Sequence, residues 1–154
     1  MILYRLTKTR YLSTAWTGTG AKEAGGRWNS PGTAMVYASE TASLTMLETL
    51  VHLHTPQLLD IFSLLRIAVP DELVMRADIT ALPPDWSREE APSELPVYGD
   101  TWVASLASVG LLVPSALSPV EFNCLLNPEH AAFPDITRRA EEIPFRFDTR
   151  LRMS

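Results

Sequence analysis

Cysteine, histidine and long apolar runs are scarce in this chain, and each shortage excludes a class of protein. Cys124 is the single cysteine among 154 residues, so an internal disulfide framework cannot form. We interpret Cys124 as a small buried side chain, because nothing near it in the sequence would activate its thiolate. No apolar run approaches the roughly 20 residues that span a bilayer, and the first residues lack the pattern of a signal peptide. We therefore expect a cytoplasmic protein without a membrane partner.

Metal and nucleic-acid binding also find little support in the sequence. The histidines are His52, His54 and His130, and no His-Glu-x-x-His arrangement exists. On a helix His52 and His54 would point about 200° apart, so they could not share a metal ion. A net charge of −5 disfavours general binding to nucleic-acid phosphates, and the short basic pair Arg138-Arg139 is followed by two glutamates. We predict no metal site and no direct nucleic-acid binding.

Glycine is concentrated in one segment. Five of the seven glycines lie within residues 17–32, which we expect to form a loop with tight turns or close approach to a ligand. The loop is not a known phosphate cradle, because Gly18-Thr19-Gly20 lacks the third glycine of a dinucleotide fingerprint. The stretch from Gly20 to Arg27 lacks the Lys-Ser/Thr ending of a P-loop. No Gly-x-Ser-x-Gly elbow supports a serine hydrolase.

Apolar periodicity predicts more strands than helices. The expected strands are Ile2–Leu6, Ala34–Ala38, Ile61–Val69, Leu111–Val113, Phe122–Leu126 and an edge strand with Phe145–Phe147. Residues 78–98 are rich in proline and should be mostly irregular. Asp100 is expected to cap a helix that runs through Ser108 and is closed by Gly110. The strands are too closely spaced for repeated βαβ units, so the predicted class is a single α+β domain.

A second helix is predicted from Glu40 to His54, with Ser39 as its N-cap. Its apolar half contains Leu44, Met46, Leu47, Leu50, Val51 and Leu53, and the opposite half contains Thr45, Thr49 and His52. Glu48 falls about 40° beyond Leu44, on the boundary between the two halves. A carboxylate there faces either a cleft beside the core or water.

Several short motifs follow one another in a recognisable order. They are Gly25–Gly32 (GGRWNSPG), Val36–Ser39, Leu47–His52 (LETLVH), Gly99–Trp102 (GDTW), Val113–Ala116 and Asn123–Pro128. In order and spacing they resemble the RES domain family, which is named for its Arg, Glu and Ser positions. The match runs from Tyr4-Arg5 to Pro128. One small departure is Cys124, where the family pattern more often has a larger apolar side chain.

This resemblance implies a single RES domain over residues 1–154, with an ADP-ribosyltransferase-like fold of mixed and antiparallel sheets and flanking helices. It implies a bacterial toxin that consumes NAD as its substrate, without a further cofactor. The implied partner is a helix-turn-helix antitoxin of the Xre type, and base rates make a homodimer plausible. By the family pattern the active site contains Arg27, Tyr37, Glu48 and Ser115. Trp28 and Asn123 are further expected contacts for NAD.

The chemistry of the loop and strand residues agrees with these roles but does not require them. Arg27 offers a planar set of donors suited to a pyrophosphate, although it reads equally as a surface arginine in a turn. Tyr37 could stack on nicotinamide while its hydroxyl finds water or a polar partner. Aromatic residues in strands usually belong to the core, so the alternative for Tyr37 is a packing role. For Trp28, packing is favoured over substrate contact.

Glu48 and Ser115 suit the chemistry of glycosidic bond cleavage. A carboxylate near the ribose stabilises the positive charge that develops as nicotinamide leaves, if the edge of the helix faces the cleft. Ser115 could hold Glu48 or a substrate hydroxyl, or be an ordinary turn serine, and no base is evident that would make it a nucleophile. The leading hypothesis is NAD degradation with water or phosphate as acceptor. The alternatives are ADP-ribose transfer to a protein and a non-catalytic binding module.

Overall fold

A mixed sheet of seven strands forms the framework of the protein, for which a computed structural model describes residues 1–53 and 61–151. The order across the sheet is β4-β5-β6-β2-β1-β3-β7, with β4 and β5 parallel and the other neighbouring pairs antiparallel. The strands are β1 (Ile2–Lys8), β2 (Val36–Ser39), β3 (Phe62–Ala68), β4 (Val74–Arg76), β5 (Gly110–Pro114), β6 (Phe122–Leu126) and β7 (Glu141–Ile143). The predicted α+β class is confirmed.

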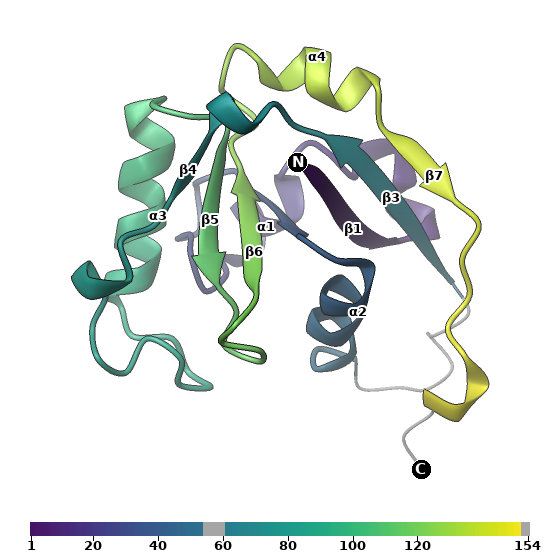
Figure 1. The fold of residues 1–154 in the computed structure, drawn as a ribbon, viewed down its shortest axis with the longest axis horizontal. Coiled ribbons are helices and arrows are strands. Elements are labelled where there is room, and N and C mark those ends of the chain that lie inside the picture. Colours follow the sequence, from purple (N-terminus) through teal and green to yellow (C-terminus); the bar gives the residue numbers. More distant parts are fainter. Residues whose placement is uncertain (54–60, 152–154) are drawn as a thin grey trace.

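Four α-helices of the described chain surround this sheet. They are α1 (Thr19–Ala24), α2 (Ala42–Leu50), α3 (Glu94–Ser105) and α4 (Phe133–Arg138), and short 3-10 turns link several elements. Figure 1 shows α3 beside β4 and β5, α2 below the middle of the sheet, and α4 across its opposite end. No helix among residues 1–53 and 61–151 is long and apolar enough to cross a membrane.

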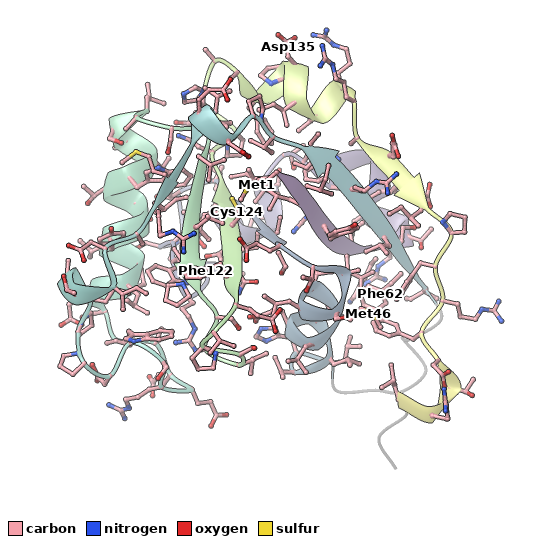
Figure 2. All side chains as sticks on the ribbon, viewed as in Figure 1. Met1, Met46, Phe62, Phe122, Cys124 and Asp135 are labelled. Atoms are coloured by element: carbon pink, nitrogen blue, oxygen red, sulfur yellow. The ribbon has the colours of Figure 1, made fainter. Side chains whose placement is uncertain are left out.

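The two faces of the sheet carry separate cores, because successive side chains of a strand point to opposite faces. Val36 and Ala38 of β2 face one core, which also contains Cys124, Leu126 and the α4 residues Phe133 and Ile136. Figure 2 shows Cys124 close to Met1, which packs against this core. On the other face, Leu111, Val113 and Leu125 pack against Leu95, Trp102 and Val103 of α3. Tyr37 of β2 packs against this second core.

The sheet narrows where β1 meets β2. β1 pairs with β3 from Ile2 opposite Ala68 to Lys8 opposite Phe62, whereas it pairs with β2 where Tyr4 lies opposite Ser39. A third core, formed by α2 with β1 and β3, lies beside this junction, and Figure 2 shows Met46 of α2 next to Phe62. The pairing of β1 with β2 is therefore short, and the polar side chain of Ser39 lies at this junction.

Helix α2 begins later than predicted. Ser39 belongs to β2, and the cap is Thr41, whose Oγ1 accepts a hydrogen bond from the Leu44 amide at 3.0 Å. The helix ends at Leu50, and His54 lies outside the described residues.

The apolar face of α2 also differs from the prediction. Leu47 and Val51 are 42% and 49% exposed, whereas Thr45 is buried. Met46 and Leu50 pack toward β1 and β3, and the flank with Glu48 reaches the residues that end β5 and begin β6. Contacts on both flanks, rather than the apolar stripe alone, therefore set the orientation of the helix.

Two segments expected to be irregular contain helices. The glycine-rich segment holds α1, and α3 begins at Glu94, because Pro96 is tolerated in the first turn of a helix. Asp100 consequently lies inside α3 rather than at its cap. The helix ends at Ser105, its C-cap Leu106 has a positive φ of 55°, and Gly110 instead begins β5.

The last predicted strand is also displaced. The final strand is β7, which pairs with β3 and ends before Pro144. Phe145 and Phe147 lie outside any strand, yet Phe147 is buried and its ring meets that of Phe62 edge to face at 5.8 Å. The aromatic signal therefore marked the core and not an extended backbone. The short strand β4 and the helix α4 were not predicted.

Candidate active site

Glu48 is held by side chains from two other elements. Oγ of Ser115, just after β5, donates to Glu48 Oε1 at 2.8 Å, and Nδ2 of Asn123 on β6 donates to the same oxygen at 2.7 Å. None of the described residues donates to Glu48 Oε2. The half-buried carboxylate thus has one oxygen fixed by two donors and one without a donor among the described residues.

The orientation of these donors is itself determined. Ser39 lies opposite Asn123 on the paired strands, and its Oγ donates to Asn123 Oδ1 at 2.7 Å, which turns the Asn123 amide nitrogen toward Glu48. The amides of Leu117 and Ser118 both donate to Ser115 Oγ at 3.1 Å. The single hydroxyl hydrogen of Ser115 is therefore available for Glu48.

The role of Ser115 follows from this arrangement. Its side chain is completely buried, accepts two main-chain hydrogen bonds and donates to a carboxylate. A serine nucleophile needs a base that accepts its proton and a face open to the substrate. The geometry matches a serine that orients Glu48, the first of the roles considered for it.

A second cluster surrounds Tyr37 of β2 and includes residues of the loop between α1 and β2. The Tyr37 hydroxyl donates to Asn29 Oδ1 at 2.6 Å and accepts from the Trp28 amide at 3.1 Å. Burial raises the pKa of Tyr37 well above its usual value, so the hydroxyl is neutral and can donate. A polar partner for this hydroxyl was expected, and Asn29 is that partner.

The glycine loop is also clamped onto α3. A methyl group added at Gly99 would lie 1.7 Å from the carbonyl oxygen of Trp28, so the backbones of helix and loop touch. The Ser30 amide donates to Asp100 Oδ1 at 3.0 Å. Trp28 is 2% exposed and its ring packs against Tyr98. This burial favours the packing role of the indole over a contact with substrate.

Arg27 projects from this loop toward residues 83–91. Its Nη1 donates to the carbonyl of Trp86 and its Nη2 to that of Glu89, each at 3.1 Å. No carboxylate of the described chain forms a salt bridge with it. The guanidinium is thus positioned by two neutral backbone carbonyls.

Both clusters are linked to side chains on one face of β2. Tyr37 and Ser39 are alternate residues of β2, so their side chains point to one face. The Tyr37 hydroxyl accepts a hydrogen bond from Trp28 in the loop that carries Arg27. Ser39 donates to Asn123, which donates to Glu48. No described hydrogen bond joins Arg27 directly to Glu48.

Arg5 lies beside the link between the clusters. Its Nη1 donates to the Tyr37 carbonyl at 2.8 Å and its Nε to the Ala15 carbonyl at 2.9 Å. Burial lowers the pKa of Arg5 to about 10, so the group is still a cation at neutral pH. Sequence reasoning did not identify Arg5, which appeared there only at the start of the matching pattern. Among residues 1–53 and 61–151 no group of three or more potential metal ligands is close enough to hold an ion.

The order of the motifs in the sequence agrees with comparisons to known proteins. The model of the RES domain matches residues 2–148. The chain belongs to the RES domain family. A relative named Toxin Res, from Yersinia enterocolitica, is 42% identical over 152 residues, which are 99% of this chain and all of the relative.

Two further similarities are to a second named toxin and to a solved structure. The Prs ADP-ribosylating toxin of a Sphingobium strain is 42% identical over 117 residues, covering 74% of this chain and 73% of that protein. The crystal structure of the MbcT–MbcA toxin–antitoxin complex of M. tuberculosis contains a similar fold, with a TM-score of 0.69 and 20% identity. That match covers 97% of this chain and 85% of the other, and it establishes the fold alone.

Proposed function

We propose that this chain is the toxin of a toxin–antitoxin system and that it cleaves the nicotinamide–ribose bond of NAD. The observation that carries the proposal is the Glu48 carboxylate, whose Oε1 is fixed by Ser115 and Asn123. Relatives named as toxins, one of them ADP-ribosylating, support the substrate class.

Glu48 has the geometry to stabilise the reaction's positive charge. As the bond between ribose C1′ and the nicotinamide nitrogen breaks, its electron pair leaves with neutral nicotinamide and the ribose becomes an oxocarbenium ion. Glu48 Oε2 faces this charge or a ribose hydroxyl. Water then attacks C1′ and releases a proton, giving ADP-ribose. Ser115 and Asn123 hold Oε1 throughout, so no reorganisation is needed as the charge develops.

Arg27 and the loop supply binding to the other half of the dinucleotide. Oxygens of the pyrophosphate would replace or join the Trp86 and Glu89 carbonyls as acceptors, and they carry the charge that these carbonyls lack. In this proposal the exposed part of the Tyr37 ring contacts the nicotinamide ribose region. Asn123 contributes through the hydrogen bond that it donates to Glu48.

Purified protein incubated with NAD tests this function. We expect free nicotinamide to appear, measured by chromatography, and to be lost when Glu48 is replaced by Gln. Reactions with and without inorganic phosphate identify the acceptor, because mass spectrometry separates ADP-ribose from its phosphorylated form. Absence of nicotinamide release in both buffers would overturn the proposal. Catalysis unchanged by Glu48→Gln would overturn the role of Glu48.

ADP-ribose transfer to a protein is the second candidate, favoured by the name of the Sphingobium relative. The first bond cleavage is the same, so Glu48 and Arg27 serve both reactions. Mass spectrometry of cell proteins after expression distinguishes them. A discrete ADP-ribosylated target supports transfer, whereas loss of bulk NAD without such a target supports depletion.

We also propose an antitoxin partner of the Xre helix-turn-helix type. The fold relative was solved as a toxin–antitoxin complex, and an enzyme that consumes NAD must be restrained in its host. The test is to co-express the product of the adjacent gene and to measure growth and copurification. We expect that product to be a small helix-turn-helix protein that restores growth. Failure of the neighbouring gene product to bind would contradict this assignment.

A further inference from the structure

Arg27 lies in a two-residue turn whose closing residue is fully buried. Gly26 and Asn29 pair across the turn, with the Gly26 amide donating to the Asn29 carbonyl at 2.9 Å. Arg27 and Trp28 are the two residues between them. Asn29 is 1% exposed, so its side chain has no surface with which to touch a substrate.

The Asn29 amide joins α1, β2 and the segment after the turn to this turn. Its Nδ2 donates to the Ala21 carbonyl of α1 at 2.8 Å and to the Thr33 carbonyl at 3.0 Å. Its Oδ1 accepts from the Tyr37 hydroxyl of β2, which in turn accepts from the Trp28 amide. The turn is therefore tied to helix and strand on both sides of Arg27. Both ends of a primary amide are needed, because one must donate and the other accept.

The surroundings leave the turn little freedom. A methyl group added at Gly26 would lie 2.7 Å from the Tyr37 hydroxyl oxygen and 2.9 Å from Asn29 Oδ1. The main chain thus approaches the Asn29–Tyr37 pair as closely as glycine permits. A small movement of that pair would move the backbone from which Arg27 projects.

We propose that Asn29 is a positioning residue for substrate binding, which acts through Arg27 by fixing the turn that carries it. This inference rests on the proposed function, in which Arg27 binds the pyrophosphate. Without the Asn29 amide the turn samples other conformations, and the guanidinium meets the phosphates in only a fraction of them. Substrate binding weakens, while bond cleavage at Glu48 continues, because Ser115 and Asn123 hold Glu48 independently of the turn.

A double-mutant cycle between Asn29→Ala and Arg27→Ala tests this mechanism through the KM and kcat of nicotinamide release. We expect Asn29→Ala to raise KM about 10-fold with kcat changed less than about 3-fold. In the Arg27→Ala background the same substitution should raise KM by less than about 3-fold, because the group it positions is gone. A full 10-fold effect in both backgrounds would overturn the proposal.

A second buried asparagine provides the matched control. Asn127 is as inaccessible as Asn29 and also bonds to main chain, through Nδ2 to Val103 and Oδ1 to Glu129, but its side chain forms no hydrogen bond with the turn that carries Arg27. Asn127→Ala should lower thermal stability with an unchanged KM. An equal rise in KM for both variants would mean that loss of a buried amide, and not positioning, causes the effect.

Tyr37→Phe keeps the inference testable if Asn29→Ala does not fold. It removes the hydroxyl that links Asn29 to the Trp28 amide but leaves the bonds of Asn29 to Ala21 and Thr33. The same KM increase and the same non-additivity with Arg27→Ala are expected. A wild-type protein that releases no nicotinamide overturns the proposed function and this inference with it. An active wild type with an additive cycle overturns the inference alone.

Discussion

The Glu48 half of the site is built by side chains bonding to side chains, whereas the Arg27 half is built on the main chain. Ser115 and Asn123 donate to Glu48 through their side chains, and Ser39 on β2 donates to Asn123. In the loop, Arg27 and the Asn29 amide nitrogen instead bond to backbone carbonyls.

This difference predicts two kinds of mutational response. A substitution in the Glu48 half can remove a charge while the backbone stays in place, because no main-chain bond depends on the Glu48 carboxylate. A substitution in the loop half changes the course of the chain. The first should act on kcat, and the second on KM or on stability.

The largest effect is expected for Glu48→Gln. The amide oxygen of glutamine can still accept from Ser115 and Asn123, so the local structure should persist while the charge is lost. Loss of transition-state charge stabilisation typically costs about 10²–10³-fold in kcat. Initial rates of nicotinamide release measure it, and circular dichroism checks the fold.

Glu121→Gln is the matched control for this substitution. Glu121 lies close by and accepts from Ser118 and Thr41, but it does not touch Asn123 or Ser115 through its side chain. We expect its kcat to stay within about 3-fold of wild type. A Glu48→Gln variant that kept a tenth or more of the activity would show that the carboxylate is not central to the chemistry.

The next largest effect concerns the stability of the loop half. Gly99→Ala should lower the free energy of unfolding by about 2–4 kcal/mol, because its methyl group would overlap the Trp28 carbonyl and separate α3 from the loop. Urea denaturation measures the change. Gly20→Ala is the control, since Gly20 lies in α1 with open space around its Cα, and it should be neutral or stabilising by up to about 1 kcal/mol. Equal destabilisation by both substitutions would contradict the proposed clamp.

The sequence predicted the framework of the fold better than its helices. Alternating apolar residues located β1, β3 and β6, whose side chains fill the two faces. The density of glycine was interpreted as a loop. In the structure Gly18 and Gly25, both with positive φ, are the N-cap and the C-cap of α1. Glycine at helix ends and glycine in loops leave the same mark in a sequence, so only tertiary contacts separate them.

The sequence indicated the charged residues of the candidate site better than the side chains that hold them in place. Glu48 was located at the edge of its helix, and the bond from Ser115 was among the roles considered. Ser39 was expected to cap a helix and Asp100 likewise, yet each bonds to a residue distant in the sequence. Small polar residues form caps and long-range bonds with equal ease, so local sequence does not decide between them.

A smaller effect is expected for Arg27→Ala, which sharpens the comparison in the loop half. KM for NAD should rise about 10- to 30-fold with kcat within about 3-fold, because the pyrophosphate loses a charged donor pair distant from the bond that breaks. Arg88→Ala is the control, since Arg88 is exposed and pairs with Asp85 in the neighbouring segment. A fall in kcat rather than a rise in KM would place Arg27 at the reacting bond and remove the distinction between the halves.

The smallest effect is expected for Cys124 and tests the face of β6 that lies opposite the candidate site. On β6, Asn123 points to the site, whereas Cys124 points into the core, where burial raises its pKa from 9.0 to about 12. The unfolded chain therefore releases the thiol proton above pH 9 while the folded protein retains it, so stability is lost as pH rises. Between pH 8 and 10 this thiol should account for about 1.4 kcal/mol of lost unfolding free energy.

Cys124→Ala isolates that contribution, because other titrations, including that of Tyr37, occur in both proteins and cancel in the difference. The variant should be less stable at pH 8, owing to the cavity that the missing sulfur leaves. Its free energy of unfolding should then fall by about 1.4 kcal/mol less than that of wild type on going to pH 10. Urea denaturation at both pH values measures the two slopes. Identical slopes would mean that water reaches the thiol in the folded protein, and that the face of β6 opposite the site is not a closed core.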